Sequence, residues 1–443
     1  MGIVNAKKGS EGGLLKPTRH DIDWRNPDFL DDVKYEEELR RVADACHGCR
    51  RCVSLCNSFP TLFDLIDESE TFEVDGVSYN DFDSVIDHCY MCDLCFMTKC
   101  PYVPPHEWEI DFPHLMLRGK AIKHAKNKVK LRDRILTSTD IIGKIFSKII
   151  LSKVINLMNK VMIFRKILCK FFGIHEKAKL PQFVSKTAKS LKLSYKDNNS
   201  KHKVAIFTTC YHNYNEPNVI QDFYDVLKHN NISVEIIRDD NCCGMPKLEL
   251  GDLKLVEKMM LKNISKLIKF VDKGYYIIAP IPSCVLMFKQ ELPLLFPSNL
   301  DLIKISNSFR DPFEFLNYLN TNGLLNTNFK NKLGDVSYQV ACHQRVQNMG
   351  MLTKKILELI PGTTVNAIEK CSGHDGTYGV KSESHDIAIK IARPITKAFK
   401  DANFDSFTSD CSLAAHHIEN SLGNVQTPEH PISLIKKAYG IST

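Results

Sequence analysis

The chain has 443 residues, of which 43% are hydrophobic, and such a length and composition are typical of a globular protein with about two to four domains. Its first residues contain no apolar stretch long enough for a secretory signal, and no run approaches the roughly 18 uninterrupted apolar residues of a membrane span. Sixteen cysteines without such a signal indicate a metal-binding chain in a reducing compartment rather than a disulfide scaffold.

Residues 1–35 are polar and predict an extended N-terminal arm, and residues 36–117 follow with eight cysteines in two closely spaced runs. Cys46, Cys49, Cys52 and Cys56 form the first run, and Cys89, Cys92, Cys95 and Cys100 form the second. Three cysteines, each separated from the next by two residues, and then a fourth are the spacing that holds a [4Fe–4S] cluster. The fourth cysteine can ligate the other cluster. The pattern predicts a helical, ferredoxin-type module with two [4Fe–4S] clusters, in which Cys56 and Cys100 can exchange partners. A helix that starts near Tyr35 is expected to deliver Cys46.

Zinc and disulfides are the two alternatives for these eight cysteines. Zinc sites usually pair two separated CxxC knuckles instead of placing three cysteines in a row. Disulfides are disfavoured in a chain that is expected to stay in a reducing compartment. Two complete sets of cluster ligands indicate a protein that carries electrons.

Residues 118–200 form a basic segment. Between Arg118 and Lys203 there are 23 Lys and Arg residues against four acidic ones, an excess of 19 positive charges in a chain whose net charge is +7. The rest of the chain is therefore net acidic. A basic segment confined to one part of an acidic chain favours docking to an anionic surface over nucleic-acid binding.

Amphipathic helices are expected between residues 140 and 173. At 100° per residue, Ile142, Ile145, Phe146 and Ile149 share one face of a first helix, the phase slips near Ser152, and a second helix is expected to run on to Phe172. Arg165 falls on the apolar face of that second helix. The polar faces carry the candidate membrane-contact residues Lys144, Lys148, Lys160 and Lys166. The alternative is a pair of amphipathic helices packed on the protein's own core.

From residue 201 onward, strand-like and helix-like segments alternate, and cysteines follow the strands. The half at residues 201–310 contains Cys210, Cys242, Cys243 and Cys284, and the half at residues 333–443 contains Cys342, Cys371 and Cys411. Equivalent cysteines are offset by 132, 129 and 127 residues, which indicates a duplication. The alternation predicts two α/β cysteine-rich domains with parallel sheets, in a multidomain chain that is α+β elsewhere. Each half should gather its thiols at the carboxyl ends of its strands.

Two ferredoxin-type runs followed by two cysteine-rich repeats resemble the CCG-domain iron–sulfur oxidoreductases. This family includes the cysteine-rich subunits of anaerobic glycerol-3-phosphate dehydrogenase and of heterodisulfide reductase, and the iron–sulfur subunits of glycolate and lactate oxidation. The resemblance covers nearly all residues from about 36 to 443. It implies a cytoplasmic subunit, peripheral on the inner face of the cell membrane. Such a subunit takes electrons from a flavin-bearing dehydrogenase and passes them to quinone in a respiratory chain.

The chain departs from the family's repeat, which runs Cys, then Cys-Cys-Gly, then Cys-x-x-Cys. Cys284 is followed by Val-Leu-Met287 and Cys411 by Ser-Leu-Ala414, and Ser372 replaces the second cysteine of the later pair. Cys210, Cys242, Cys243 and Cys284 still suffice for a third iron–sulfur cluster. The second repeat keeps a candidate site of Cys342, His343, Cys371 and Cys411, with His374, His416 and His417 as other substitutes. No fourth cubane cluster is expected there, and a site of three cysteines and one histidine for iron or zinc, or a quinone pocket that uses a histidine, stays open.

No strand-to-helix GxGxxG motif and no P-loop is present in the sequence, so no flavin or nicotinamide site is expected. We therefore expect an electron-transfer subunit of an oxidoreductase, without a substrate site of its own, between a flavin-dependent dehydrogenase and membrane quinone or another acceptor. The substrate of that dehydrogenase would be glycerol 3-phosphate, glycolate or lactate. The alternative is a heterodisulfide or thiol reductase-type subunit that splits a disulfide substrate, and the missing thiols weaken it.

Overall fold

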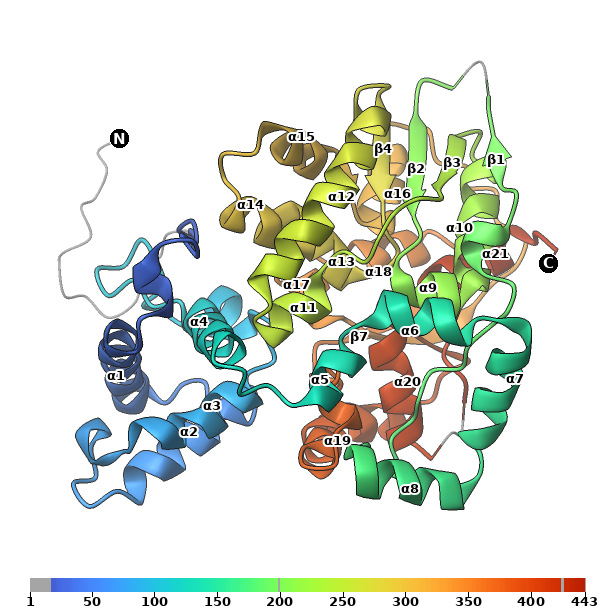
Figure 1. The fold of residues 1–443 in the computed structure, drawn as a ribbon. Helices are drawn as coiled ribbons and strands as arrows, with labels where there is room; N and C mark the ends of the chain where they lie inside the picture. The colour runs from blue at the N-terminus through green and yellow to red at the C-terminus, as the bar shows by residue number, and fades with distance from the viewer. Residues whose placement is uncertain (1–16, 198–199, 424–425, 443) are drawn as a thin grey trace. The chain divides into compact units, whose positions relative to one another are not determined.

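The computed structural model describes residues 17–197, 200–423 and 426–442. These residues belong to two compact units (Figure 1). The first unit consists of Met1–Val129, Lys247–Leu253 and Leu294–Phe296, and the second consists of Lys130–Pro246, Lys254–Pro293 and Pro297–Thr443. Each unit is described below by itself.

The first unit is helical. Its α-helices are α1 (Asp32–Cys49), α2 (Ser58–Asp67), α3 (Phe82–His88) and α4 (Phe112–Ala125), joined by the short turns η1 (Pro27–Leu30), η2 (Val74–Gly76), η3 (Tyr79–Asp81) and η4 (Cys95–Lys99). The Asp31 side chain caps α1 by accepting from the Lys34 N–H. Helix α1 then carries Cys46 and Cys49 on its last turns, which confirms the expected helix that delivers Cys46.

Aromatic side chains form the core of the first unit. Phe59 of α2 stacks on Phe112 of α4 with ring centroids 4.6 Å apart, and both rings are buried. Helix α4 approaches α1 at Gly119, where an added Cβ would lie 2.2 Å from the hydroxyl oxygen of Tyr35. Only glycine permits this approach, which fixes the spacing between the two helices that flank the cysteine runs.

The second unit contains two β-sheets. The first sheet has the order β1-β3-β2-β4-β5, from β1 (Ser194–Tyr195), β2 (Lys203–Phe207), β3 (Ser233–Ile237), β4 (Tyr275–Ile278) and β5 (Phe309–Arg310). The second has the order β7-β6-β8, from β6 (Gly334–Gln339), β7 (Thr363–Ile368) and β8 (Ser406–Ser409). All neighbours are parallel except the edge pair β1 and β3. The strands β3-β2-β4 and β7-β6-β8 share order and direction, so the duplication and the parallel sheets predicted from the sequence are confirmed.

The remaining helices precede these strands, lie between them or follow them along the chain. They are α5 (Leu131–Leu136), α6 (Thr139–Phe146), α7 (Ile149–Met158), α8 (Met162–Phe172), α9 (Cys210–Tyr214), α10 (Pro217–His229), α11 (Met245–Leu250), α12 (Leu253–Val271), α13 (Pro282–Leu286), α14 (Leu292–Leu295), α15 (Leu300–Ser308), α16 (Pro312–Thr321), α17 (Cys342–Arg345), α18 (Leu352–Leu357), α19 (His385–Asp401), α20 (Ser412–Ser421) and α21 (Pro431–Tyr439), with the turns η5 (Ala188–Ser190), η6 (Met287–Glu291) and η7 (Tyr378–Val380). The edge strands β1 and β5 were not predicted, because a two-residue strand has no periodicity of its own.

The two repeats share one large hydrophobic core. It includes Phe223 of α10, Phe313 of α16, Tyr338 of β6 and Tyr439 of α21. Helix α21 ends the chain's second repeat but packs against α10 of the first, where the Lys436 ammonium lies 2.9 Å from Asp222 and 2.8 Å from Asp225. A shared core of this kind makes the two repeats one structural body rather than two independent domains.

Helices α6, α7 and α8 differ from the sequence prediction in two ways. The expected second helix is broken, since α7 ends at Met158 and α8 begins at Met162. The small and polar residues Gly143, Ser147, Ser152 and Arg165 are the buried ones. At Gly143 an added Cβ would lie 2.1 Å from the Tyr214 ring of α9, so this glycine lets α6 approach the first repeat. In Figure 1, α7 and α8 lie at the edge of the second unit.

The contacts of Arg165 explain why this charged residue lies on the inner face of α8. Its guanidinium donates to the carbonyl oxygens of His175 at 2.8 Å, Ala178 at 2.6 Å and Glu176 at 3.1 Å. The side chain thereby fixes the loop that follows α8, and the aliphatic side chains of the helix remain on its outer side. Among the described residues, no helix has the length and apolar character needed to cross a membrane.

Candidate metal centres

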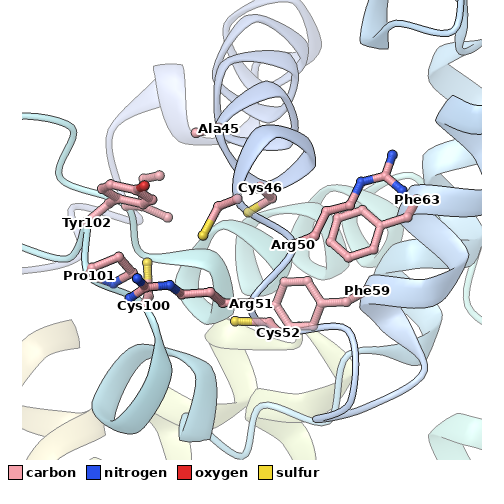
Figure 2. A pocket seen from close by; sticks show the side chains of 12 residues that line it. Ala45, Cys46, Arg50, Arg51, Cys52, Phe59, Phe63, Cys100, Pro101 and Tyr102 are labelled. Atoms are coloured by element: carbon pink, nitrogen blue, oxygen red, sulfur yellow. The ribbon is translucent and has the colours of Figure 1, made fainter. Parts of the chain in front are cut away.

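Four thiols of the first unit surround one hollow. Cys46, Cys49, Cys52 and Cys100 line it together with Phe59, Phe63, Tyr102 and Ile110, and it holds about 300 Å³ of empty space that is partly open to solvent. Figure 2 shows the side chains of Cys46, Cys52 and Cys100 around this hollow. Three of the four thiols come from the first cysteine run, and Cys100 comes from the second.

The turn after α1 brings Cys52 back to this hollow. Arg50 ends α1 in a left-handed conformation, with φ of 50°. Its guanidinium donates to Asp67 at 2.8 Å and lies 5.1 Å above the ring of Phe63. These contacts with α2 hold the turn that redirects the chain between Cys49 and Cys52.

Two of the remaining thiols, Cys56 and Cys89, lie near Cys95. Burial raises the pKa of Cys95 well above its ordinary value, and charges on Cys89, Cys56 and Cys52 add to the effect, so these thiols lie near Cys95. Cys92 stands between Met91 and Asp93, which adopt left-handed backbone angles with φ of 55° and 61°. The π-helical turn η4 then separates Cys95 from Cys100, whose N–H donates to the Cys95 carbonyl at 2.8 Å. Cys100 thus lines the hollow of the first run, and Cys56 lies near Cys95 of the second.

Burial makes these thiols hard to ionise in the protein alone. It raises the pKa of Cys46 far above its usual range and that of Cys52 to about 12, and the neighbouring cysteines of the same hollow contribute. Four thiolates can gather in an apolar hollow only when a cationic metal core offsets their charge. The donor set therefore fits an iron–sulfur cluster.

In the first repeat, four thiols follow three adjacent parallel strands. Cys210 comes after β2, Cys242 and Cys243 after β3, and Cys284 after β4. They form a chain of thiol contacts from Cys210 to Cys242, Cys243 and Cys284. Hydrogen bonds from Cys210 and Cys243, and from the Gly244 N–H, lower the pKa of Cys242.

Thr139 of α6 also reaches this cluster of thiols. Its hydroxyl donates to the Cys210 sulfur at 3.2 Å and lies 3.7 Å from the Cys242 sulfur. Thr139 was not predicted from the sequence. In the sequence it is 30 or more residues from any cysteine, and it directly precedes the helices of residues 140–173, which were interpreted as a membrane-contact surface.

The second repeat brings three thiols to the matching edge of its own sheet. Cys342, Cys371 and Cys411 follow β6, β7 and β8. Burial, with a contribution from the Asp375 carboxylate, raises the pKa of Cys342 and raises that of Cys371 and Cys411 to about 11. The Gly373 N–H donates to the Cys371 sulfur at 3.3 Å. Asp375 has a left-handed backbone, with φ of 84°, and lies near all three thiols.

The histidines named as substitutes for the missing thiols take different positions. His343 is hydrogen-bonded through Nδ1 to the Ser283 hydroxyl at 2.8 Å, beside Cys284 of the first repeat. His416 bonds Glu216 at 2.5 Å and Glu419 at 2.8 Å, and these carboxylates overcome burial to raise its pKa to about 9. His374 and His417 have ring centroids 5.8 Å apart, and burial lowers their pKa values to about 3 and about 4.

His175, His385 and Asp386 form a further group, which was not predicted from the sequence. Their ligand atoms lie within 4.8 Å of one another. The two imidazole rings, however, stack with centroids 3.9 Å apart and planes at 16°. Nitrogen lone pairs lie in the ring planes, so those of stacked rings run side by side and do not converge on one ion. This group is best described as a stacked pair that joins the loop after α8 to α19.

An apolar and basic surface lies on α6, α7 and α8. It carries exposed aliphatic and aromatic side chains, among them Ile150 at 76%, Phe171 at 71% and Ile163 at 70% of their full exposure. Lys144, Lys148, Lys160 and Lys166 are exposed on the same helices. Such large apolar side chains in one continuous segment mark an interaction surface. We refer to this feature as the α6–α8 surface.

Comparison with known protein families identifies the repeats. Residues 204–289 and 336–419 each match the family described as the cysteine-rich CCG domain. The chain contains two CCG domains. The first match runs from β2 into η6 and the second from β6 into α20, so each spans the strand ends that carry its cysteines.

Curated relatives agree with this result. One of the subunits of anaerobic glycerol-3-phosphate dehydrogenase from Escherichia coli strain K12 is 25% identical over 342 residues, which cover 74% of this chain and 82% of that protein. An uncharacterized iron–sulfur protein of Methanocaldococcus jannaschii is 26% identical over 413 residues, or 88% of this chain and 70% of that protein. One of the subunits of the fumarate reductase (CoM/CoB) of Methanothermobacter marburgensis is 27% identical over 229 residues, or 51% and 43%. The chain is homologous to these proteins, and the resemblance inferred from the cysteine pattern is confirmed.

Proposed function

We propose that the protein is an iron–sulfur electron-transfer subunit of a flavin-dependent dehydrogenase. In this proposal one [4Fe–4S] cluster is held by Cys46, Cys49, Cys52 and Cys100 and a second by Cys56, Cys89, Cys92 and Cys95. The observation that carries it is the hollow lined by Cys46, Cys49, Cys52 and Cys100, since a fourth thiol taken from the other cysteine run is the ligand pattern of a two-cluster ferredoxin module. Cys56 is then left for the second set, and it lies near Cys95.

A third cluster belongs to the first CCG domain, at Cys210, Cys242, Cys243 and Cys284. Each of these four thiols already contacts the next, and they lie at the carboxyl edge of a parallel sheet, where α/β proteins bind their cofactors. The second CCG domain, with Cys342, Cys371 and Cys411, lies where electrons leave the chain of clusters for the acceptor. The carboxylate of Asp375 lies near its three thiols, and His343 bonds the Ser283 hydroxyl of the first repeat instead.

The partner is proposed from the relatives. Those proteins are named as subunits of a glycerol-3-phosphate dehydrogenase and of a fumarate reductase, so oxidation or reduction of the organic substrate is assigned to another subunit. We place this chain between such a flavin-bearing subunit and quinone or another acceptor. The substrate would be glycerol 3-phosphate, glycolate or lactate.

We also propose that the α6–α8 surface docks on the anionic inner face of the cell membrane. Aliphatic side chains are exposed on the outer side while Gly143, two serines and Arg165 are buried on the inner side, and lysines are exposed beside the aliphatic side chains. An apolar face flanked by lysines is suited to the boundary between lipid headgroups and acyl chains. Packing on the protein's own core does not account for the outward-facing side chains.

Anaerobic purification followed by iron, sulfide and zinc analysis tests the function. The expected result is iron and acid-labile sulfide for three clusters, together with paramagnetic signals that appear on reduction by one electron per cluster. Zinc in place of iron would overturn the proposal. Cleavage of an organic disulfide by the reduced protein at a rate that exceeds quinone reduction would favour the reductase alternative.

A further inference from the structure

Arg19 joins the N-terminal segment to the second cysteine run. The Arg19 guanidinium donates to the two carboxylate oxygens of Asp93 at 2.7 and 3.0 Å, and to the two of Asp111 at 2.8 and 3.1 Å. It also lies 4.4 Å above the ring of Phe96. The side chain of Arg19 is 6% exposed and that of Asp93 is 2% exposed. A buried, doubly bidentate arginine of this kind holds its partners in one geometry.

The two carboxylates lie beside different thiol sets. Asp93 is between the ligands Cys92 and Cys95, and its charge contributes to raising the pKa of Cys95. Asp111 caps α4 by accepting from the His114 N–H, and its charge contributes to raising the pKa of Cys100. The Arg19 charge therefore compensates two carboxylates. Asp93 lies beside one proposed cluster, and Asp111 lies beside the other.

We propose that Arg19 is a positioning residue that fixes the Cys92–Cys95 turn and keeps the reduction potentials of both clusters from falling. This inference rests on the proposed function, because it requires clusters at both thiol sets. Each cluster gains one electron, and hence one negative charge, on reduction. Carboxylates without a compensating cation oppose the added negative charge and lower the reduction potential. The positive charge of Arg19 stabilises the reduced cluster and raises the potential.

Other contacts hold the N-terminal segment in place without the Arg19 side chain. The Thr18 N–H donates to the Pro104 carbonyl at 3.0 Å, and the Ile22 N–H donates to the Leu294 carbonyl at 2.8 Å. The Trp24 indole donates to the Leu295 carbonyl at 3.2 Å and packs edge-on against Phe296. A substitution at Arg19 thus removes a charge while the backbone of the segment keeps its anchors.

The test uses the full chain, purified anaerobically, with redox titrations followed by paramagnetic resonance. Arg19→Gln should retain most of its iron and shift both midpoint potentials in the negative direction, more strongly for the cluster next to Asp93. Arg19→Lys keeps the charge but loses the paired geometry, and it should give a smaller shift. The matched control is Arg41→Gln, since Arg41 pairs with Glu38 at 2.7 Å on the surface of α1.

A double variant separates charge from structure. Arg19→Gln with Asp93→Asn restores the local net charge, so the potentials should return most of the way to the wild-type values. Potentials that stay at the wild-type values in Arg19→Gln, or that stay shifted in the double variant, would overturn the inference. A wild-type protein without iron–sulfur signals would instead overturn the proposed function, so the two failures are distinguishable.

Discussion

Each cysteine substitution should remove the cluster to which that thiol is a ligand. Cys100 belongs to the second run in sequence, but it lines the hollow of Cys46, Cys49 and Cys52. We predict that Cys100→Ser and Cys49→Ser remove the same paramagnetic signal and about one cluster's worth of iron each. Cys56→Ser and Cys92→Ser should remove the other signal. Redox titration of the four anaerobic variants checks the assignment, and a shared loss in Cys100→Ser and Cys92→Ser would contradict the exchange.

The unequal repeats give a second prediction at this scale. Cys243→Ala should lower iron content, because Cys243 links two other thiols of a four-thiol site. Cys371→Ala should leave iron nearly intact and yet slow electron delivery to quinone, because its repeat keeps three thiols, and hydroxyl or imidazole groups are weaker ligands for a cubane cluster. Iron analysis and quinone-reduction rates measure both effects. Equal loss of iron would mean that a non-thiol group completes a fourth cluster.

Cys169→Ala serves as the control for both cysteine variants. Cys169 is in α8, with its sulfur 3.5 Å from the Ser382 hydroxyl, and it belongs to neither thiol set of the repeats. The substitution should change neither iron content nor quinone reduction. A loss of iron in this variant would show that removal of any thiol disturbs the clusters, and the comparison of the two repeats would then carry no information.

At the scale of elements, α6 to α8 show what a periodic pattern can and cannot predict. The sequence predicted amphipathic helices and exposed lysines here, and both are present. It did not predict which face is buried, because that depends on partners such as Tyr214 for Gly143 and on the loop carbonyls for Arg165. Contacts with Tyr214 of α9 and with the loop directly after α8 thus selected Gly143 and Arg165 for the inner face.

The α6–α8 surface yields the prediction for this scale. Reversal of Lys144, Lys148, Lys160 and Lys166 to Glu should weaken sedimentation with anionic vesicles, since each lysine near such a surface contributes about 1 kcal/mol. High salt should weaken the wild-type binding in part. Replacement of Ile150, Ile163 and Phe171 by Ser should also weaken it without a change of charge. Sedimentation by the four-lysine variant equal to that of the wild type would contradict the proposal.

A matched control exists on another helix. Lys254, Lys258, Lys262 and Lys269 are exposed on α12, and their reversal to Glu changes the net charge by the same amount. Binding that falls only in the α6–α8 variant locates the contact on that surface. Equal losses in both variants would indicate general attraction of a basic protein to anionic lipid, and would remove the argument for a specific docking face.

For the whole molecule, most of what could be predicted about the domains and the thiol sites came from the spacing of the cysteines. The offsets of 132, 129 and 127 residues revealed the duplication, and the strand-end rule placed each half's cysteines at one edge of its sheet, as the strand order confirms. Two tertiary contacts could not be predicted, since nothing local in the sequence pairs His343 with Ser283 or Thr139 with Cys210. The first depends on how the two repeats pack across their shared core, and the second on how α6 packs against the first repeat.

His416 allows that packing between the repeats to be measured. It connects α20 of the second repeat to Glu216 at the start of α10 in the first, and it also pairs with Glu419. The carboxylates raise the pKa of His416 to about 9, while the pKa of Glu216 falls to about 2, so both groups are charged across the neutral range. A histidine whose folded pKa is raised stabilises the protein fully below its unfolded value of about 6.5, and this contribution is lost as the pH rises through the folded value.

We therefore predict that His416→Gln lowers the melting temperature most between about pH 5 and pH 6.5, where the histidine is charged in both states and the glutamates are ionised. The difference from the wild type should shrink as the pH rises from about 7 and vanish above about pH 10. Thermal unfolding of the anaerobic protein at a series of pH values measures it. Lys354→Gln is the control, because Lys354 pairs with Glu358 at the C-terminal end of α18, and this ion pair contains no histidine. A His416→Gln effect that is constant from about pH 5 to about pH 10 would show that the imidazole acts through packing rather than through its charge.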